Sequence, residues 1–596
     1  MDGDKLTALP AHRPVLALVI LAVMATSASA VEVREARWGF DGTVVPGRIN
    51  MLSVLVTNDG AEMWQAPVTL EKRNALGEKL GADLMQPCFL APGMSRWLRF
   101  YPYVGTSGNE WRLKVGRDER DLRRPRFGPP ATVFLWDASR GGASPRIPVL
   151  PEELFPAGVG ATDGLHALAI DAVPRWEPVR RRAVMDWLHA GGIVHILHDE
   201  TGAYPQFPQD MSELNDGRQK YRVGAGRVFR HPIGRNRLTT SYLSNQGYGG
   251  PALQESEEGY HWPLEDSVFV GLRSLIEPQH NWALIALALV GYVVLVGPIN
   301  RLVGGARGDY RRTIGFFLGM VVLFGLLLGY LGRRGYEEEA GVHTLTYARP
   351  VGSGGYHLTQ WSTVFVTEGD YYTITHPGDQ NYYSTCQEFE AVNGVIQNGA
   401  GGRFVVDMPL YSSRSFLHRG RAEGPDLGLE VHDWTSESGR TRVSLRPGPG
   451  FPEDVETMWA YIDDRFFKAN RRGGAIEVDA SWGVSRETFL EPNQLRMGEM
   501  GFRSGRAVPM MKKGLSASEV YGRFVRPVIA HSLGGTDAFP YYVTGARPDN
   551  EALQLYVYAT APREFAVQSE GLGREEGYVL YHVTMTKPEG ADDGAS

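Results

Sequence analysis

The sequences WALIALALVGYVVLVGPIN (residues 282–300) and IGFFLGMVVLFGLLLGYL (residues 314–331) flank a short basic segment, RLVGGARGDYRR. Neither apolar stretch contains a charged residue, and each comes close to the roughly 20 apolar helical residues that cross a bilayer. Two buried helices of a soluble core are the alternative, but such helices normally carry a polar stripe, which is absent here. We therefore predict a transmembrane helical hairpin over residues 281–332.

The segment between the two stretches predicts the orientation of the hairpin. Residues 301–312 contain four arginines and one aspartate. Short loops with an excess of Lys and Arg stay in the cytoplasm. We expect a bacterial inner-membrane protein whose loop 301–312 is cytoplasmic and whose two large flanking regions lie on the exported side.

Four glycines form a stripe on the second stretch, and their spacing at about 100° per residue places them on one helix face. The stripe consists of Gly315, Gly319, Gly325 and Gly329. Small residues let helices approach closely, so the stripe is expected to seat the first helix. Pairing of two copies of the protein through this helix is the alternative.

Composition excludes several classes of protein. The chain has 596 residues and a net charge of -7, which allows three or four domains. It has no basic patch with interleaved aromatic residues, so we expect no nucleic-acid partner. The only two cysteines, Cys88 and Cys386, fall in different predicted domains, and no metal-ligand spacing is present. We therefore expect no disulfide framework, no metal and no cofactor.

The amino terminus resembles an export signal. Residues 15–25 are apolar, and Ala28 and Ala30 give the small-x-small pattern that signal peptidase cleaves. We expect a signal peptide over residues 1–30. Because Lys5 is offset by neighbouring acidic residues, an uncleaved third membrane anchor is the alternative.

Most of the remaining sequence is typical of strands. Residues 31–116 alternate with period two between turn signals, which predicts an immunoglobulin-like β-sandwich. Residues 117–130, RDERDLRRPRFGPP, break the pattern and predict a linker. Residues 340–590 again alternate and predict one extended or two consecutive β-sandwiches, with a helical insertion at 516–533.

Residues 131–280 have a different pattern, in which continuous apolar strands alternate with an amphipathic helix at 177–192. This predicts a flavodoxin-like parallel α/β domain with both faces of its sheet buried. Polar side chains follow three of the strands, where open α/β sheets bind ligands. We take these four residues as candidate ligand-binding residues, although Asp at a strand end also commonly caps a turn: Asp137, Asp171, His198 and Asp199.

Two phrases carry a resemblance to known proteins. WLHAGGIVHIL, Trp187 to Leu197, looks like the class I glutamine amidotransferase-like domain of many bacterial membrane proteins. GYVVLVGPINRL, Gly291 to Leu302, resembles the membrane segment of a group of bacterial proteins that combine an exported β-sandwich, this α/β domain, membrane helices and a carboxy-terminal β region. The resemblance implies a degenerate amidotransferase-like domain.

Amidotransferase chemistry needs a cysteine nucleophile on a strand-to-helix elbow. Residues 131–280 contain no cysteine and no G-x-S-x-G elbow, so we expect no catalytic residues. The sequence favours a non-enzymatic envelope protein that acts as a scaffold or sensor, with the lipid bilayer and other envelope proteins as partners. The alternative is a small-molecule-binding module in the α/β domain that signals across the membrane.

Overall fold

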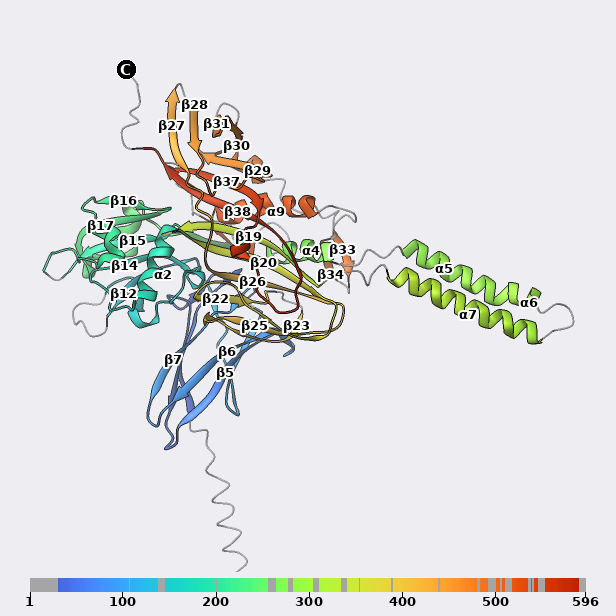
Figure 1. Cartoon of the computed structure of the whole chain (residues 1–596). Helices are drawn as coiled ribbons and strands as arrows, with labels where there is room; N and C mark the ends of the chain where they lie inside the picture. The colour runs from blue at the N-terminus through green and yellow to red at the C-terminus, as the bar shows by residue number, and fades with distance from the viewer. Residues whose placement is uncertain are drawn as a thin grey trace, which may run out of the picture.

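The computed structural model contains both α and β structure, with sheets predominating, and two apolar helices, in coarse agreement with the prediction (Figure 1). The predicted signal peptide at residues 1–30 lies outside the described part of the chain. The structure describes residues 31–106, 108–137, 145–199, 201–255, 264–276, 282–303, 310–333, 340–352, 354–386, 390–437, 440–479, 483–490, 500–503, 506–509, 517–533, 537–538, 541–544 and 552–588.

Two sheets pack face to face at the amino-terminal end of the described chain. One has the order β1-β4-β7, and the other has the order β10-β9-β5-β6-β23-β25-β21. Alternating side chains of both sheets, such as Val54 and Leu113, fill a single apolar core between them. The strands of these sheets are β1 (Val31–Trp38), β4 (Leu52–Asn58), β5 (Trp64–Arg73), β6 (Lys79–Leu90), β7 (Ser95–Phe100), β9 (Glu110–Val115), β10 (Asp118–Asp121), β21 (Asp370–Ile374), β23 (Ala391–Gln397) and β25 (Arg403–Met408).

The second of these sheets joins distant parts of the sequence. β23 pairs with β6 in parallel, so strands from the carboxy-terminal region extend the amino-terminal sheet. Gly81 makes this contact possible, because its φ is +62° and a Cβ there would lie 2.5 Å from Thr385 Oγ1. The Ala82 amide donates to the same hydroxyl at 2.8 Å. The two β regions predicted separately therefore share one sheet.

The segment predicted as a linker contains two strands. β10 pairs with β9, and β11 (Arg126–Phe127) pairs in parallel with β2 (Thr43–Val44). Arg112 in β9 binds Glu119 and Asp121 in β10, at 2.9 Å and 2.7 Å. Ion pairing across the strands thus replaces the apolar alternation whose absence suggested a linker.

The α/β domain contains a six-stranded sheet of order β13-β12-β14-β15-β17-β16. Neighbouring strands are parallel except β16, which is antiparallel to β17. Numbered along the chain, the five parallel strands therefore lie in the order 2-1-3-4-5. They are β12 (Ala131–Trp136), β13 (Val149–Pro151), β14 (Leu165–Ile170), β15 (Ile193–His198) and β17 (Gly226–Gly234), with β16 at Lys220–Val223.

Both faces of this sheet are covered. Helix α2 (Pro178–His189) packs on one face through side chains that include Trp187 and Leu188. The segment with α3 (Thr240–Asn245) covers the other face through Leu238 and Leu243. Short helical turns complete the domain: η1 (Glu152–Leu154), η2 (Val159–Ala161), η3 (Gln209–Asn215) and η4 (Arg235–Arg237).

A 13-stranded sheet forms the centre of the molecule. Its neighbouring strands are antiparallel except β19 and β38, and every residue of β20 is buried. The strands in spatial order are β24 (Gly399–Ala400), β22 (Gln380–Ser384), β26 (Ser412–Glu423), β20 (Gly355–Val366), β19 (Gly341–Val351), β38 (Arg574–Thr586), β37 (Ala552–Thr560), β29 (Thr457–Ile462), β30 (Arg465–Arg472), β31 (Ala475–Asp479), β28 (Arg440–Arg446) and β27 (Glu430–Glu437), with β32 (Val484–Ser485) beside β30.

Two helices pack against this sheet. α4 (Leu264–Ile276) and α9 (Ala517–Ser532) share an apolar core with strands of the sheet and with the α/β domain. They approach closely at Gly271, where a Cβ would lie 2.5 Å from Phe524 Cε2. The remaining elements are β3 (Arg48–Ile49), β8 (Tyr103–Val104), β18 (Ala252–Glu255), α8 (Arg486–Leu490), β33 (Met500–Arg503), β34 (Arg506–Pro509), β35 (Asp537–Ala538), β36 (Tyr541–Thr544) and η8 (Arg563–Phe565).

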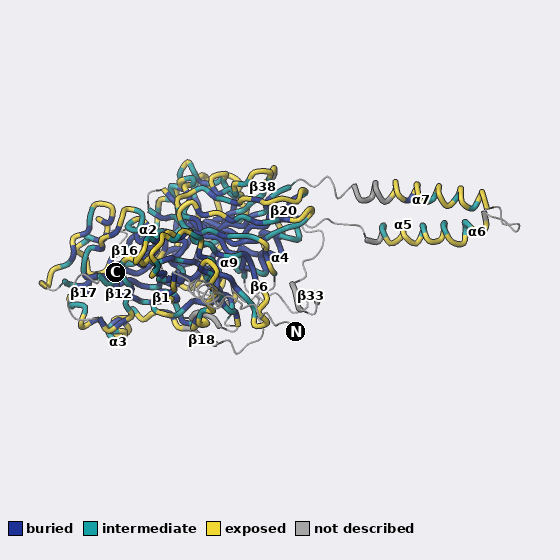
Figure 2. Tube along the Cα trace, turned by 90° about the horizontal axis from the view of Figure 1, so that it is seen from below, coloured by how far each residue is buried: buried dark blue, intermediate teal, exposed yellow. Residues whose placement is uncertain are grey.

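The hairpin projects from the body as two long helices side by side (Figure 1). They are α5 (Trp282–Val294), which continues through the π-helical turn η5 (Leu295–Ile299) into α6 (Asn300–Val303), and α7 (Tyr310–Arg333). Pro298 lies in this turn. The helix departs from regular α geometry there because proline cannot donate the backbone hydrogen bond of an α-helix. The hairpin is largely exposed, whereas the body has a buried interior (Figure 2).

Candidate functional site

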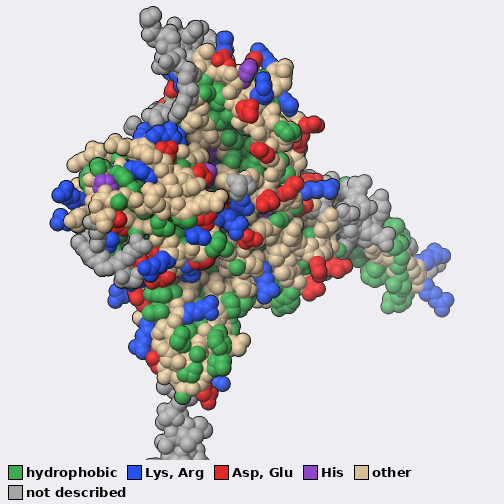
Figure 3. All heavy atoms as spheres, turned by 60° about the vertical axis from the view of Figure 1, so that its left-hand side comes forward, with side chains coloured by type: hydrophobic (Ala, Val, Ile, Leu, Met, Phe, Trp, Pro, Cys, Tyr) green, Lys and Arg blue, Asp and Glu red, His purple; other side chains and the backbone are tan. Residues whose placement is uncertain are grey.

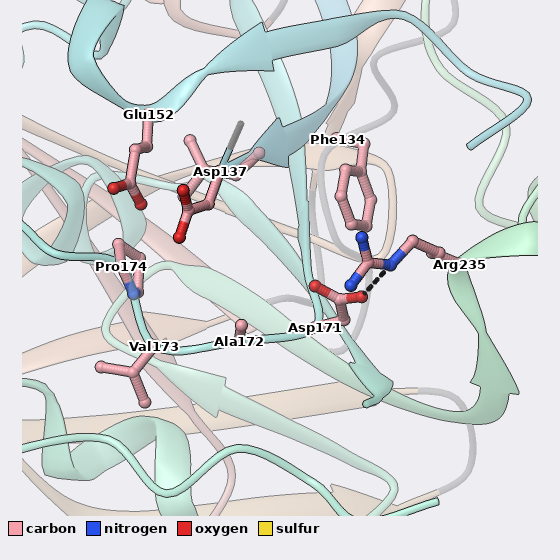
Figure 4. A pocket seen from close by; sticks show the side chains of 9 residues that line it. Phe134, Asp137, Glu152, Asp171, Ala172, Val173, Pro174 and Arg235 are labelled. Carbon is pink, nitrogen blue, oxygen red and sulfur yellow. Dashed lines mark ion pairs between the residues drawn. The ribbon is translucent and has the colours of Figure 1, made fainter. Parts of the chain in front are cut away.

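The carboxyl edge of the parallel sheet brings two of the predicted residues together. Asp137 follows β12 and Asp171 follows β14, and these neighbouring strands have connections that run in opposite directions. Ligands of open α/β sheets bind at this type of position. Both carboxylates line one cavity there, together with Glu152 and Arg235 (Figure 4).

Arg235 largely occupies this crevice. Its Nε lies 2.6 Å from Asp171 Oδ2, and the two side chains are 11% and 6% exposed. Its guanidinium also lies 5.6 Å from the ring centre of Trp136. The remaining cavity has a volume of about 10 Å³, which is about enough for one water molecule. Among the described residues, the crevice therefore holds an ion pair and a cavity about the size of one water molecule.

Asp137 has a weaker partner. Its Oδ2 lies 3.8 Å from Nε of Arg175, whose side chain is 64% exposed. No group of three or more His, Cys, Asp or Glu side chains among the residues that the structure describes is placed to hold a metal ion. The edge therefore has acidic character without the geometry of a metal centre.

The other two predicted residues lie one strand further along. The His198 ring packs edge-on against Tyr204, with ring centres 4.3 Å apart. Asp199 Oδ1 accepts hydrogen bonds from the Thr201 amide at 2.8 Å and the Ala203 amide at 3.0 Å. These hydrogen bonds, with that of the Thr201 hydroxyl, lower the pKa of Asp199. Neither residue lines the cavity of Asp137 and Asp171, and Asp199 caps a turn.

Three of the four glycines of the stripe on α7 have no close neighbour in the structure. A Cβ at Gly315, Gly319 or Gly325 would meet no atom within 4 Å. The helices instead meet around Phe324, whose ring centre lies 5.1 Å from that of Tyr292. The role of the glycine stripe in helix packing therefore stays a prediction, and the contact that the structure shows between the helices is this aromatic pair. Gly329 is outside the residues whose side-chain surroundings are described.

A larger cavity lies at the opposite edge of the α/β sheet. It is found near the amino ends of β12, β14 and β15 and has a volume of about 190 Å³. Residues from all three parts of the body, which are the amino-terminal sheets, the α/β domain and the central sheet, line it, among them Val45 and Arg48, Asp163 and Trp187, and Arg349 and His357. We call this the junction cavity. No sequence pattern predicted it, because its lining residues come from distant regions of the chain and share no motif.

The comparisons with known proteins identify no family. The sequence matches no protein-family model and no curated protein. Among solved structures, the chain is similar to a cycloisomaltooligosaccharide glucanotransferase of Paenibacillus sp., with 8% identity over 76% of this chain and 98% of that chain and a TM-score of 0.16. It is also similar to an M1 zinc metallopeptidase from Deinococcus radiodurans, with 17% identity over 24% of this chain and 40% of that chain and a TM-score of 0.10. Such low TM-scores support no conclusion about fold or function.

Proposed function

We propose that the protein is a non-enzymatic envelope protein, anchored in the bacterial inner membrane, that acts as a scaffold or sensor through its exported domains. The observation that carries the proposal is the hairpin, whose two helical spans are long and apolar enough to cross a membrane. Large apolar side chains such as Leu287 and Leu326 are exposed along it, and exposed apolar surface of this extent favours contact with lipid. Basic side chains gather at its far end (Figure 3), where Arg301, Arg311 and Arg312 lie.

The body is suited to transmit contacts to the anchor. α4 ends five residues before α5 begins and packs against the central sheet. In the proposal, a partner or ligand that shifts the sheet acts on the hairpin through α4. We also propose that the α/β domain is a flavodoxin-like, degenerate amidotransferase-like domain and that 31–116 is the immunoglobulin-like part of the amino-terminal sheets.

The lack of a cysteine in the α/β domain supports the non-enzymatic part of the proposal. Both cysteines of the chain are buried and lie outside the α/β domain, Cys88 in β6 and Cys386 after β22. Burial raises the pKa of both thiols, so the reactive thiolate is disfavoured.

The orientation is tested with single introduced cysteines in intact cells and a membrane-impermeant maleimide. We expect Leu76→Cys, in an exposed turn of the body, to react, and Leu302→Cys, at the far end of the hairpin, to react only after permeabilisation. The native cysteines are buried, so the wild-type chain is the unlabelled control. Labelling of Leu302→Cys in intact cells would refute the orientation.

The scaffold role is tested by crosslinking in intact cells, followed by detergent purification and mass spectrometry. We expect stable envelope partners, including a second copy of the chain if the uncovered stripe on α7 pairs two molecules. A variant with Leu326→Arg, which places a charge on the exposed apolar face, is the matched control for contacts that need the anchor. Recovery of the wild-type protein without any partner would contradict the scaffold role.

A further inference from the structure

The junction cavity carries more positive than negative charge. Three guanidinium groups lie close enough to influence one another electrostatically, those of Arg48, Arg349 and Arg419. Two acids oppose them. Asp163 pairs with Arg419, and both side chains are 5% exposed. Glu265 accepts a hydrogen bond from the Tyr103 hydroxyl at 3.0 Å, and burial raises its pKa. At least one positive charge in this partly buried cluster is therefore uncompensated.

Arg48 is the arginine whose charge is least compensated. Among the described residues, its guanidinium forms no ion pair. Burial lowers the pKa of Arg48 to about 10. At neutral pH the group still carries its charge, and a buried charge without a partner is costly. Removing Arg48 from the empty protein should therefore cost little stability, which is unusual for a partly buried residue.

The remaining donors at the cavity are held in place. Arg349 donates to the Ala190 carbonyl at 2.8 Å and to His357 Nδ1 at 3.0 Å. Because Nδ1 accepts, the neutral ring of His357 carries its proton on Nε2. Burial and the neighbouring arginine lower the pKa of His357, which keeps the ring neutral. Its Nε2 has no hydrogen-bond partner although the residue is only 2% exposed, which leaves a buried donor unsatisfied.

The apolar wall, the net positive charge and the volume of the junction cavity indicate which class of anion it fits. With Asp163 and Glu265 both ionised, the three arginines leave one positive charge to neutralise, whereas a phosphate carries up to two negative charges. Val45, Leu165 and Trp187 form an apolar part of the wall. The volume of about 190 Å³ is below the roughly 300–1,000 Å³ of pockets for drug-sized ligands. A ligand with a single carboxylate and a short hydrocarbon body fits the charge, the apolar wall and the volume of the cavity.

We propose that the junction cavity binds a small monocarboxylate, with its carboxylate between Arg48 and Arg349 and its hydrocarbon body against the apolar wall. The site joins the amino-terminal sheets, the α/β domain and the central sheet, so an occupant links all three. This assignment goes beyond the proposed scaffold or sensor function, and it does not depend on how the hairpin is oriented.

The test is the thermal unfolding of the full-length protein in detergent, titrated with acetate, propionate and butyrate at constant ionic strength in chloride. We expect a saturable rise in the unfolding midpoint of at least about 2 °C. Affinity should rise about fourfold for each added CH₂ group, because each one adds apolar area against the wall. Butyramide, which lacks the charge, and phosphate should produce no saturable rise.

The variant Arg48→Met should keep the wild-type midpoint in chloride and lose the response to butyrate. Arg182→Met is the matched control, because Arg182 pairs with Asp379 on the surface and should keep the response. An undiminished response in Arg48→Met, an equal response to butyramide, or no response of the wild-type protein to any carboxylate would each overturn the assignment. If Arg48→Met does not fold, the chain-length series in the wild-type protein decides alone.

Discussion

The ion pair between Asp171 and Arg235 gives a direct test of whether the predicted crevice is structural. With both side chains at most 11% exposed, removal of one partner leaves the other charge buried, at a cost of about 3–5 kcal/mol. We therefore expect Asp171→Asn to destabilise the α/β sheet strongly. Replacement of both partners, Asp171→Leu with Arg235→Met, should recover much of that loss, because an apolar pair leaves no unpaired charge.

Hydrogen exchange of backbone amides in β12 and β14 is the appropriate assay, since it reports the opening of this sheet within the full chain. A loss of about 3 kcal/mol corresponds to exchange that is more than about 100-fold faster. Asp137→Asn is the control. The Asp137 carboxylate pairs with the exposed Arg175 at 3.8 Å. Loss of this ion pair should therefore lower the free energy of unfolding by at most about 1 kcal/mol.

Two results would refute this reasoning. Exchange in Asp171→Asn no faster than in Asp137→Asn would show that the pair contributes no structural stability. Loss of a biological phenotype in an Asp171→Asn protein whose exchange is unchanged would instead show that the crevice binds a ligand.

Two further predictions concern packed side chains. His195 Nδ1 lies 2.9 Å from His231 Nε2, and burial lowers their pKa values to about 3 and about 4. Because the unfolded chain takes up these protons near pH 6.5, the stability of the α/β sheet should fall as the pH drops from 6.5 to 4. His231→Phe should make that fall in stability, measured by hydrogen exchange, less steep. An unchanged slope would contradict the buried neutral pair. Gly271→Ala should lower the midpoint of thermal unfolding, because the added methyl group would meet Phe524. Gly522→Ala, in open space on α9, should raise the midpoint by improving helix propensity. Equal shifts of the midpoint in the two variants would refute this account of helix packing.

The sequence was most informative where the determinant is local. Apolar length predicted the hairpin, continuous apolar runs predicted the parallel strands, and amphipathic spacing predicted the helix that spans Ala517–Ser532. The placement of Asp137 and Asp171 at one edge also followed, because parallel strands end together.

Long-range features could not be predicted in this way. The partner of Asp171 is Arg235, which follows three further strands in the sequence and has no periodic relation to it. The contact between Tyr292 on α5 and Phe324 on α7 had no signal in the glycine pattern, because small residues permit close helix packing without specifying which side chains meet. The junction cavity depends on how three distant regions of the sequence meet in the fold.

The pairing of β6 with β23 also has a consequence for how the protein is made. Ala82 donates to Thr385, 303 residues later, and residues 282–333 of the hairpin are synthesised between them. The edge of β6 thus remains open while the ribosome completes the hairpin, and it closes only after the following segment has been delivered to the same compartment. Unpaired edges invite aggregation, so nascent chains that stall at the hairpin should be substrates for chaperones and proteases. In the proposed topology, insertion of the hairpin and completion of the first sheet are therefore one coupled step in biogenesis.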